Sequence, residues 1–401
     1  MWRSVSAAGA AVALLAACSS GRSAPRRAET RPVGTSSIET ITLPPDTGGA
    51  GGASGSSGRR AATVLGSGDV LIHPPLWQQA HADALAEGRS GYDFGPMYAS
   101  IAPDVRSADL ATCEMETPLA PPGGPFVGWP NFSAPPQVLT ALKGVGYRSC
   151  TTASNHTLDQ GYSGLKRTLD ELDAAGLKHT GSARTAGEAA TPLILTLDNG
   201  VRVGQLAYSF NFNGHEPSAG EAWQANLIEV PNILAAAHRM KQAGADVIVL
   251  SLHWGTEYDH LATQQQRQEA DALLASPDVD LILGDHAHVV QPAEKIHGKW
   301  VFYCMGNQIS RHEDPIADSR EGVMPRVTFT EVSSHHFTAT SVQTIPTWME
   351  DSPKLRLVDV PRALRSGTLT AAQRAADEHA RAQIVKYLDA YGAVRDGLQI
   401  P

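Results

Sequence analysis

The residues best suited to metal chemistry lie where apolar stretches of this sequence stop. Five such stretches end in carboxylate, amide or imidazole side chains, in the clusters Gly68-Asp69, Glu114-Met115-Glu116, Asn155-His156, His253-Trp254-Gly255 and Asp285-His286-Ala287-His288. Taken singly, each cluster has an ordinary explanation, because Asp after Gly is a common turn residue and Asn is a common helix cap. Their joint occurrence at the ends of successive predicted strands predicts a metal site instead.

The donor types indicate which metals this site would prefer. Carboxylate, amide and imidazole groups together suit a first-row divalent ion such as manganese, iron or zinc, and no thiolate is needed. Residues two apart in an extended strand point to the same side of it. We therefore expect His286 and His288 to reach one centre from the end of a strand.

The elements that must position these side chains alternate along the chain from Ala61 onward. Strands are predicted within 62–70, 109–119, 146–156, 201–212, 246–255, 280–288 and 299–307, and helices within 162–177, 231–245 and 264–277. This alternation predicts an α/β sheet with helices packed on its faces. In open α/β sheets, ligands bind at the carboxyl ends of the strands, which is where the polar clusters lie.

The pattern changes near Arg326. VTFTEV and FTATSVQTIP predict antiparallel strands, and a last helix is predicted at about 370–390. We therefore expect one domain at 61–325 that the strands and helix of 326–401 complete.

The N-terminal region differs in composition from the rest of the chain. Arg3 precedes an apolar stretch too short to span a bilayer as a mature helix, which ends in Leu15-Ala16-Ala17-Cys18. Residues 1–18 resemble a bacterial lipoprotein signal in which Cys18 is lipidated; a plain secretory signal is the alternative. Both predict export, and lipidation predicts an anchor on the outer face of the cell membrane. Residues 19–60 are rich in Ser, Gly, Pro and Arg, which predicts a disordered tether.

Charge and cysteine content exclude other classes of protein. Residues 61–401 carry 25 basic and 38 acidic side chains, a formal charge of −13, without basic clusters, so nucleic acid is not an expected partner. Cys113, Cys150 and Cys304 lack the CxxC spacing of a structural zinc site. We expect all three to be buried small apolar residues, with a Cys113–Cys150 disulfide as the alternative in an oxidising compartment.

An ordered series of motifs across residues 62–315 resembles one known family. The motifs are GDV (68–70), METPL (115–119), SNHTLDQG (154–161), HWGTEY (253–258), GDHAHVVQP (284–292) and YCMGN (303–307). In this order they resemble the bacterial CapA family of poly-γ-glutamate capsule synthesis proteins, whose domain looks like a calcineurin-type metallophosphoesterase. The resemblance implies a four-layered α/β/β/α sandwich with a centre for two divalent ions (manganese, iron or zinc) on one edge.

The same resemblance implies a role for each matched residue. Asp69 and His288 would ligate the first ion, Asn155, His253 and His286 the second, and Glu116 would bridge the two or lie near the bridge. His156 would protonate the leaving group, since an imidazole can gain or lose a proton near neutral pH.

Several positions depart from the family pattern or have an open role. Glu114 replaces the usual Asn, and it is either an additional ligand or a salt-bridged neighbour. Asp285 is also unusual, and it could orient an imidazole. Glu257 in HWGTEY and Asn307 in YCMGN either support the ligands or contact substrate.

Histidines outside these motifs are not expected to be ligands. Many metallophosphoesterases carry a histidine two residues after the first aspartate, and here His73 lies four residues after Asp69. We do not expect His73 to replace it. Of the others, His215 is the one expected to face the site.

Three functions fit this chemistry to different degrees. The first is a metal-dependent hydrolase of the cell envelope that acts on a phosphoester or related bond and is linked to an anionic polymer. The second is a non-catalytic, metal-stabilised component of polymer assembly or export, which would have membrane-bound polymer synthase components as partners. The third, an amidohydrolase barrel, is disfavoured because its His-x-His pair belongs on the first strand, whereas His286 and His288 come late.

Overall fold

The computed structural model describes residues 41–42, 59–312, 316 and 318–401. These residues belong to one compact unit, Ile38–Pro401. The predicted lipoprotein signal with Cys18 and most of the predicted tether lie outside the described residues. None of the described helices combines the length and apolar character that a membrane span requires.

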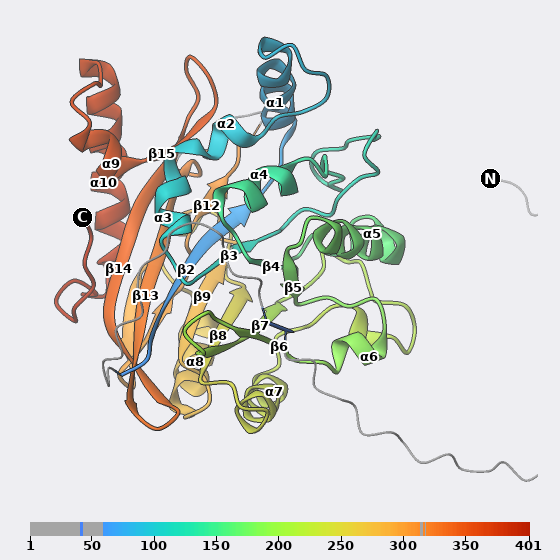
Figure 1. Cartoon of the computed structure of the whole chain (residues 1–401), viewed down its shortest axis with the longest axis vertical. Coiled ribbons are helices and arrows are strands. Elements are labelled where there is room, and N and C mark those ends of the chain that lie inside the picture. The colour runs from blue at the N-terminus through green and yellow to red at the C-terminus, as the bar shows by residue number, and fades with distance from the viewer. Residues whose placement is uncertain (1–40, 43–58, 313–315, 317) are drawn as a thin grey trace, which may run out of the picture. The chain divides into compact units, whose positions relative to one another are not determined.

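Two sheets form the centre of this unit (Figure 1). Sheet A has seven strands in the order β1 (Ile41–Thr42), β6 (Leu193–Thr196), β7 (Arg202–Ser209), β8 (Val247–His253), β9 (Leu281–Asp285), β11 (Lys299–Phe302) and β10 (Ala293–Ile296). Its central strands β7, β8, β9 and β11 are parallel.

Sheet B has eight strands. In order they are β15 (Arg356–Asp359), β14 (His336–Glu350), β13 (Glu321–Ser333), β2 (Ala61–Val70), β3 (Leu110–Glu114), β4 (Ser149–Thr151) and β5 (Lys178–Thr180), and β12 (Asn307–Ile309) also pairs with β2. Strands β2 to β5 are parallel, whereas β13 pairs antiparallel with both β2 and β14. The strands predicted after Arg326 are therefore antiparallel, although β13 begins five residues earlier, at Glu321.

Helices cover the outer face of each sheet. Sheet B is covered by α1 (Pro74–Ala86), α2 (Gly95–Tyr98), α3 (Ala102–Arg106), α4 (Val138–Val145) and α5 (Gly161–Ala174), and sheet A by α7 (Val230–Gln242) and α8 (Gln264–Ala275). A short helix, α6 (Ala186–Ala189), precedes β6, and α9 (Val360–Arg365) precedes α10 (Ala371–Leu388). In Figure 1, α10 lies in red along the orange strands β13 and β14.

Alternation along β8 shows how the layers are built. Val247 and Val249 face the core between the two sheets, while Ile248 and Leu250 face the core under α7 and α8. Every residue of β8 is buried, as expected for a strand that is covered on both faces. The four-layered α/β/β/α sandwich that the resemblance implied is thereby confirmed.

The N-terminal boundary of the folded part differs in detail from expectation. Ile41 and Thr42, inside the predicted tether, form β1 and pair in parallel with β6. Arg60, the last tether residue, is held by ion pairs to Asp246 at 3.3 Å and Glu331 at 2.8 Å. Ordered contacts of the chain therefore begin before Ala61.

Candidate metal centre

The carboxyl ends of the central strands of both sheets meet at one edge. In sheet B, Asp69 at the end of β2 pairs in register with Glu114 at the end of β3. In sheet A, His253 at the end of β8 pairs with Asp285 at the end of β9. The two edges are joined where the His286 N–H donates to the Asp69 carboxylate at 3.2 Å. The polar clusters of the sequence are therefore brought together in space.

Asp69 and Glu116 lie at the centre of this cluster. Asp69 Oδ2 lies 3.1 Å from His288 Nδ1, and Asp69 Oδ1 lies 3.9 Å from His253 Nδ1. Glu116 Oε1 faces three imidazoles, at 3.6 Å from His288 Nε2, 3.9 Å from His253 Nε2 and 4.0 Å from His156 Nε2. Donors that bind one ion at about 2.0–2.3 Å lie about 3–4 Å apart, so these separations are those expected around shared ions.

Asn155 and Glu114 complete the surroundings of His253. Asn155 Oδ1 lies 3.0 Å from His253 Nε2, and Glu114 Oε1 lies 3.8 Å from His253 Nδ1. The structure therefore places Glu114 beside His253, in one of the groups of candidate donors.

His286 and His288 do not occupy the extended strand that their spacing predicted. Strand β9 ends at Asp285, and both histidines follow it with left-handed backbones, φ +89° for His286 and φ +57° for His288. The expected geometry was wrong, because a turn and not the period of a strand brings them to the cluster. Positive φ values in residues other than glycine are uncommon and concentrate at functional sites.

The described residues include three groups of donors that could hold a divalent ion. They are Asp69 with Glu116 and His288, Asp69 with Glu114 and His253, and Glu257 with His286 and His288, and the donor atoms of each group lie within 4.8 Å of one another. All of these residues except Glu257 are buried.

The electrostatics of the cluster also fit bound cations. Both carboxylate oxygens of Glu114 and of Glu116 are buried without a hydrogen-bond partner, as is Nδ1 of His286. Burial, reinforced by neighbouring carboxylates, raises the pKa of Glu114 and Glu116 well above the usual range. Burial and nearby imidazoles lower the pKa of His286 to about 3. Buried carboxylates are costly unless paired or coordinated to metal, and neutral imidazoles are the form that ligates metals.

His288 differs from the other imidazoles. Burial would lower its pKa, but the charges of Glu116 and Asp69 outweigh that effect and raise the pKa to about 10. Asn307 lies beside it, with Oδ1 at 3.1 Å from His288 Nδ1, and its amide donates to the backbone carbonyl of His288 at 3.2 Å. Asn307 therefore positions His288 and its turn.

His156 is oriented by a carboxylate that sequence reasoning did not single out. His156 Nδ1 lies 2.7 Å from Asp159 Oδ2, which also accepts the Phe132 N–H at 2.7 Å. The Phe132 ring packs edge-on against the imidazole with 4.8 Å between centroids. These contacts direct His156 Nε2 toward Glu116, and the signal for Asp159 was its place three residues after His156 in the SNHTLDQG motif.

Aromatic and polar residues from other loops surround the cluster. Phe210 packs on His286 at 4.5 Å and Tyr258 lies 5.9 Å from His288, measured between ring centroids. His312, which we did not expect near the site, lies 6.3 Å from His288 and 4.3 Å from His73 by the same measure. No periodicity in the sequence marks these residues, because each comes from an irregular segment.

His73 and His215 stay outside the candidate donor groups. His73 belongs to none of the three groups found among the described residues. His215 Nε2 contacts Asn131 Oδ1 at 3.2 Å, and it is Asn213 that reaches Asn155, accepting a hydrogen bond at 3.4 Å.

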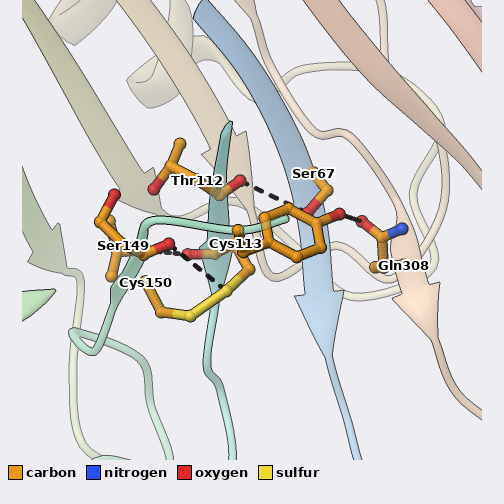
Figure 2. The surroundings of a disulfide bond; sticks show 8 residues. Ser67, Thr112, Cys113, Ser149, Cys150 and Gln308 are labelled. Atoms are coloured by element: carbon orange, nitrogen blue, oxygen red, sulfur yellow. Dashed lines mark hydrogen bonds between the residues drawn. A yellow bond between two sulfur atoms is a disulfide. The ribbon is translucent and has the colours of Figure 1, made fainter. Parts of the chain in front are cut away.

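A disulfide connects the strands that carry part of the site. Cys113 and Cys150 are register partners on β3 and β4 and are bonded to each other, contrary to the expectation of free thiols (Figure 2). Their spacing in sequence gave no sign that parallel neighbouring strands would align the two residues. Cys304 is a buried free thiol, as expected. Because Glu114 directly follows Cys113, the disulfide fixes the strand end that presents this carboxylate.

Comparison with known proteins identifies the family. Residues 63–312, more than half of the chain, match the family described as "Bacterial capsule synthesis protein PGA_cap". The chain is 31% identical over 169 residues to the PGA biosynthesis protein CapA of Bacillus subtilis, covering 42% of this chain and 44% of that protein. It is 25% identical over 193 residues to the "Probable polyglutamine synthesis accessory protein Rv0574c" of Mycobacterium tuberculosis, covering 44% and 49%.

The matches to these relatives span about half of their length. Among solved structures, the calcineurin-like phosphoesterase YfkN from Bacillus subtilis aligns with a TM-score of 0.44 and 16% identity over 82% of this chain and 99% of that chain. On the extent of the family match, this chain belongs to the bacterial capsule synthesis family PGA_cap.

Proposed function

We propose that this chain is a cell-envelope accessory protein of anionic polymer synthesis, of the poly-γ-glutamate type, and that it carries a two-metal hydrolytic centre. The observation that carries the proposal is the convergence of three imidazoles on one oxygen of the buried, otherwise unpartnered carboxylate of Glu116. The names of the relatives, a CapA protein and a synthesis accessory protein, support the link to polymer synthesis.

Each residue of the cluster has a proposed role, either in holding the ions or in proton transfer. Asp69, Glu114, Glu116, Asn155, His253, His286 and His288 would hold the ions. Two divalent ions, when bound, supply a hydroxide at neutral pH and stabilise charge on a phosphoryl-like transition state. His156, oriented by Asp159, would deliver a proton to the leaving group from Nε2, and its burial beside Phe132 keeps competing water away.

The proposed substrate is a phosphoester or a related bond in or near an anionic polymer. The formal charge of −13 on residues 61–401 disfavours the approach of an anionic substrate, and cations at the site would offset this locally. The buried carboxylates of the cluster would otherwise repel it.

A second candidate function is a non-catalytic one, and it is favoured by the name of the relative described as a synthesis accessory protein. In that case the metal centre would stabilise a non-catalytic component of polymer assembly or export, and the partners would be membrane-bound synthase components. The two candidates differ in whether His156 is needed for polymer production.

Export with a lipid anchor at Cys18 is part of the proposal. The sequence of residues 1–18 supports it, and so does the Cys113–Cys150 disulfide, because structural disulfides persist in oxidising compartments. Labelling with a palmitate analogue should mark the wild-type protein in its host and not the Cys18→Ala variant, and equal labelling of both would contradict the anchor.

The experiment on the metal centre measures bound ions and turnover in the same samples. Metal-free protein is loaded with Mn²⁺, and we expect about two ions per chain and metal-dependent turnover on a panel of phosphomonoesters, phosphodiesters and polyglutamate. His156→Ala should keep the ions and lose turnover, whereas His238→Ala, at an exposed histidine on α7, should keep both. A wild-type protein that binds no Mn²⁺ would refute the metal centre.

The second candidate is tested by polymer production in cells. If the chain acts as a hydrolase in this process, His156→Ala should reduce or alter the polymer. Unchanged polymer with His156→Ala, together with two bound ions and no turnover, would favour the non-catalytic role.

A further inference from the structure

Glu257 stands apart from the other candidate donors. It lies in the loop between β8 and α8, and its carboxylate forms a donor group with His286 and His288, with the three donor atoms within 4.8 Å of one another. Its side chain is exposed, whereas the other members of the three donor groups are all buried. Glu257 therefore occupies the solvent side of the cluster.

The loop that carries Glu257 is anchored to the turn that carries the two histidines. The Tyr258 N–H donates to the Ala287 carbonyl at 2.8 Å, and the Trp254 N–H donates to the carbonyl of Asp285, directly before the turn, at 3.3 Å. Tyr258 has a left-handed backbone, φ +62°, which a residue with a bulky side chain adopts only under constraint from its surroundings. The position of Glu257 over the two imidazoles is thus set by built-in contacts on its next neighbour.

His286, one of the two imidazoles in this donor group, has a ring nitrogen without a hydrogen-bond partner. His286 Nδ1 is buried without a hydrogen-bond partner, and His286 is only 3% exposed. The nearby ring of Phe210 covers one side of His286 and supplies no donor or acceptor for Nδ1. A cation shared between His286 and a carboxylate would satisfy both groups.

We propose that Glu257 is a metal ligand on the outer side of this centre, at the face from which substrate arrives. The inference rests on the proposed metal centre and adds to it a ligand that an incoming anion must displace or approach. A carboxylate at this face holds the ion when the site is empty of substrate and repels free phosphate. The half-exposed rings of Phe210 and Tyr258, 36% and 37% exposed, flank this entrance.

The test compares Glu257→Gln with Glu216→Gln. The first variant keeps the shape of the side chain and removes its charge. The second removes the charge of an exposed acid that belongs to none of the three donor groups among the described residues. Calorimetric titration with Mn²⁺ gives the affinity and the number of ions, and titration of the Mn²⁺-saturated proteins with inorganic phosphate gives the affinity for an anion. Thermal melts of the metal-free proteins check that both variants are folded.

We expect Glu257→Gln to weaken Mn²⁺ binding at least about tenfold, since changes even to groups behind metal ligands cost 10–100-fold. The same variant should bind phosphate several-fold more tightly at saturating Mn²⁺, because a negative charge near the anion has been removed. Glu216→Gln should match the wild type in both titrations.

Unchanged Mn²⁺ and phosphate affinities in Glu257→Gln would overturn the role of Glu257 while leaving the two-metal centre intact. A wild-type protein without bound Mn²⁺ would overturn the proposed function, and with it this inference. The two failures are therefore distinguishable within one set of titrations.

Discussion

Replacing Glu116 by Gln is the most direct perturbation of the proposed metal centre. The substitution keeps the size of the side chain and removes the charge from an oxygen that lies 3.6–4.0 Å from three imidazole nitrogens. Glu116 is 1% exposed, so water cannot replace the lost carboxylate without rearrangement of the core. We expect Glu116→Gln to weaken metal binding strongly without unfolding the protein.

The size of the effect follows from ligand linkage. A hundredfold loss of Mn²⁺ affinity is the upper end of what substitutions behind metal ligands cost, and a bridging ligand should reach it. At a Mn²⁺ concentration a thousandfold above the wild-type Kd, one bound ion stabilises the native state by about 4 kcal/mol, and this falls to about 1.4 kcal/mol in the variant. For a domain of this length 1 kcal/mol shifts Tm by about 1–2 °C, so the Mn²⁺-induced rise in Tm should be about 3–5 °C smaller.

The metal-free protein should respond less to this substitution. Burial raises the pKa of Glu116 well above the usual range, so its ionised form near neutral pH costs folding free energy. Glu116→Gln removes this cost, but it also removes the attraction between Glu116 and His288, so the metal-free Tm should change less than the Mn²⁺-loaded Tm. A purely structural role for Glu116 would lower both values of Tm by the same amount.

The assay is a pair of thermal melts, with chelator and with Mn²⁺, for the wild type, Glu116→Gln and Glu216→Gln. Mass spectrometry under native conditions counts the ions in the same samples. A Glu116→Gln protein that keeps two ions and the full Mn²⁺-induced rise in Tm would refute the assignment of Glu116 as a central ligand.

Three further predictions concern groups around the site and in the core. Asp159→Asn should lower turnover at least tenfold with the number of bound ions unchanged, because the carboxylate that orients His156 is lost; a parallel loss of metal would contradict this role. Burial and Asp318 raise the pKa of Glu321 to about 8. Between about pH 4.5 and 8 the unfolded state therefore binds fewer protons than the native state, and the free energy of unfolding falls as the pH rises. Glu321→Gln should flatten that fall, as measured by urea titrations at pH 5 and pH 8. Removing the Cys113–Cys150 disulfide, which closes a loop of 37 residues, should cost about 4 kcal/mol, and a double alanine variant with unchanged denaturant midpoint would contradict this estimate.

Much of the fold was predictable because its signals are local. The spacing of Leu165, Leu169 and Leu172 predicted a helix, and these residues are buried on one face of α5. Continuous apolar residues predicted β8 and β9 as covered strands. Helix α1 was not predicted, since its weakly segregated apolar residues follow two prolines and resemble a loop.

The candidate donors were predictable for the same reason. Asp69, Glu114, His253 and Asp285 each follow directly on an apolar stretch, and parallel strands bring their carboxyl ends to one edge. The order of residues along the chain thus determined which side chains gather. It also supplied the ordered motifs by which the family is recognised.

Tertiary structure alone decided how the gathered side chains face one another. The left-handed backbones of His286 and His288, the Cys113–Cys150 bond and the approach of Glu257 depend on contacts between segments that are distant in sequence. Residue spacing specifies the side of a strand on which a side chain lies, but it carries no information on the turn beyond the strand or on the register of a neighbour. Those features are set by the pairing of strands within each sheet and by the packing of the two sheets against each other, which only the folded chain defines.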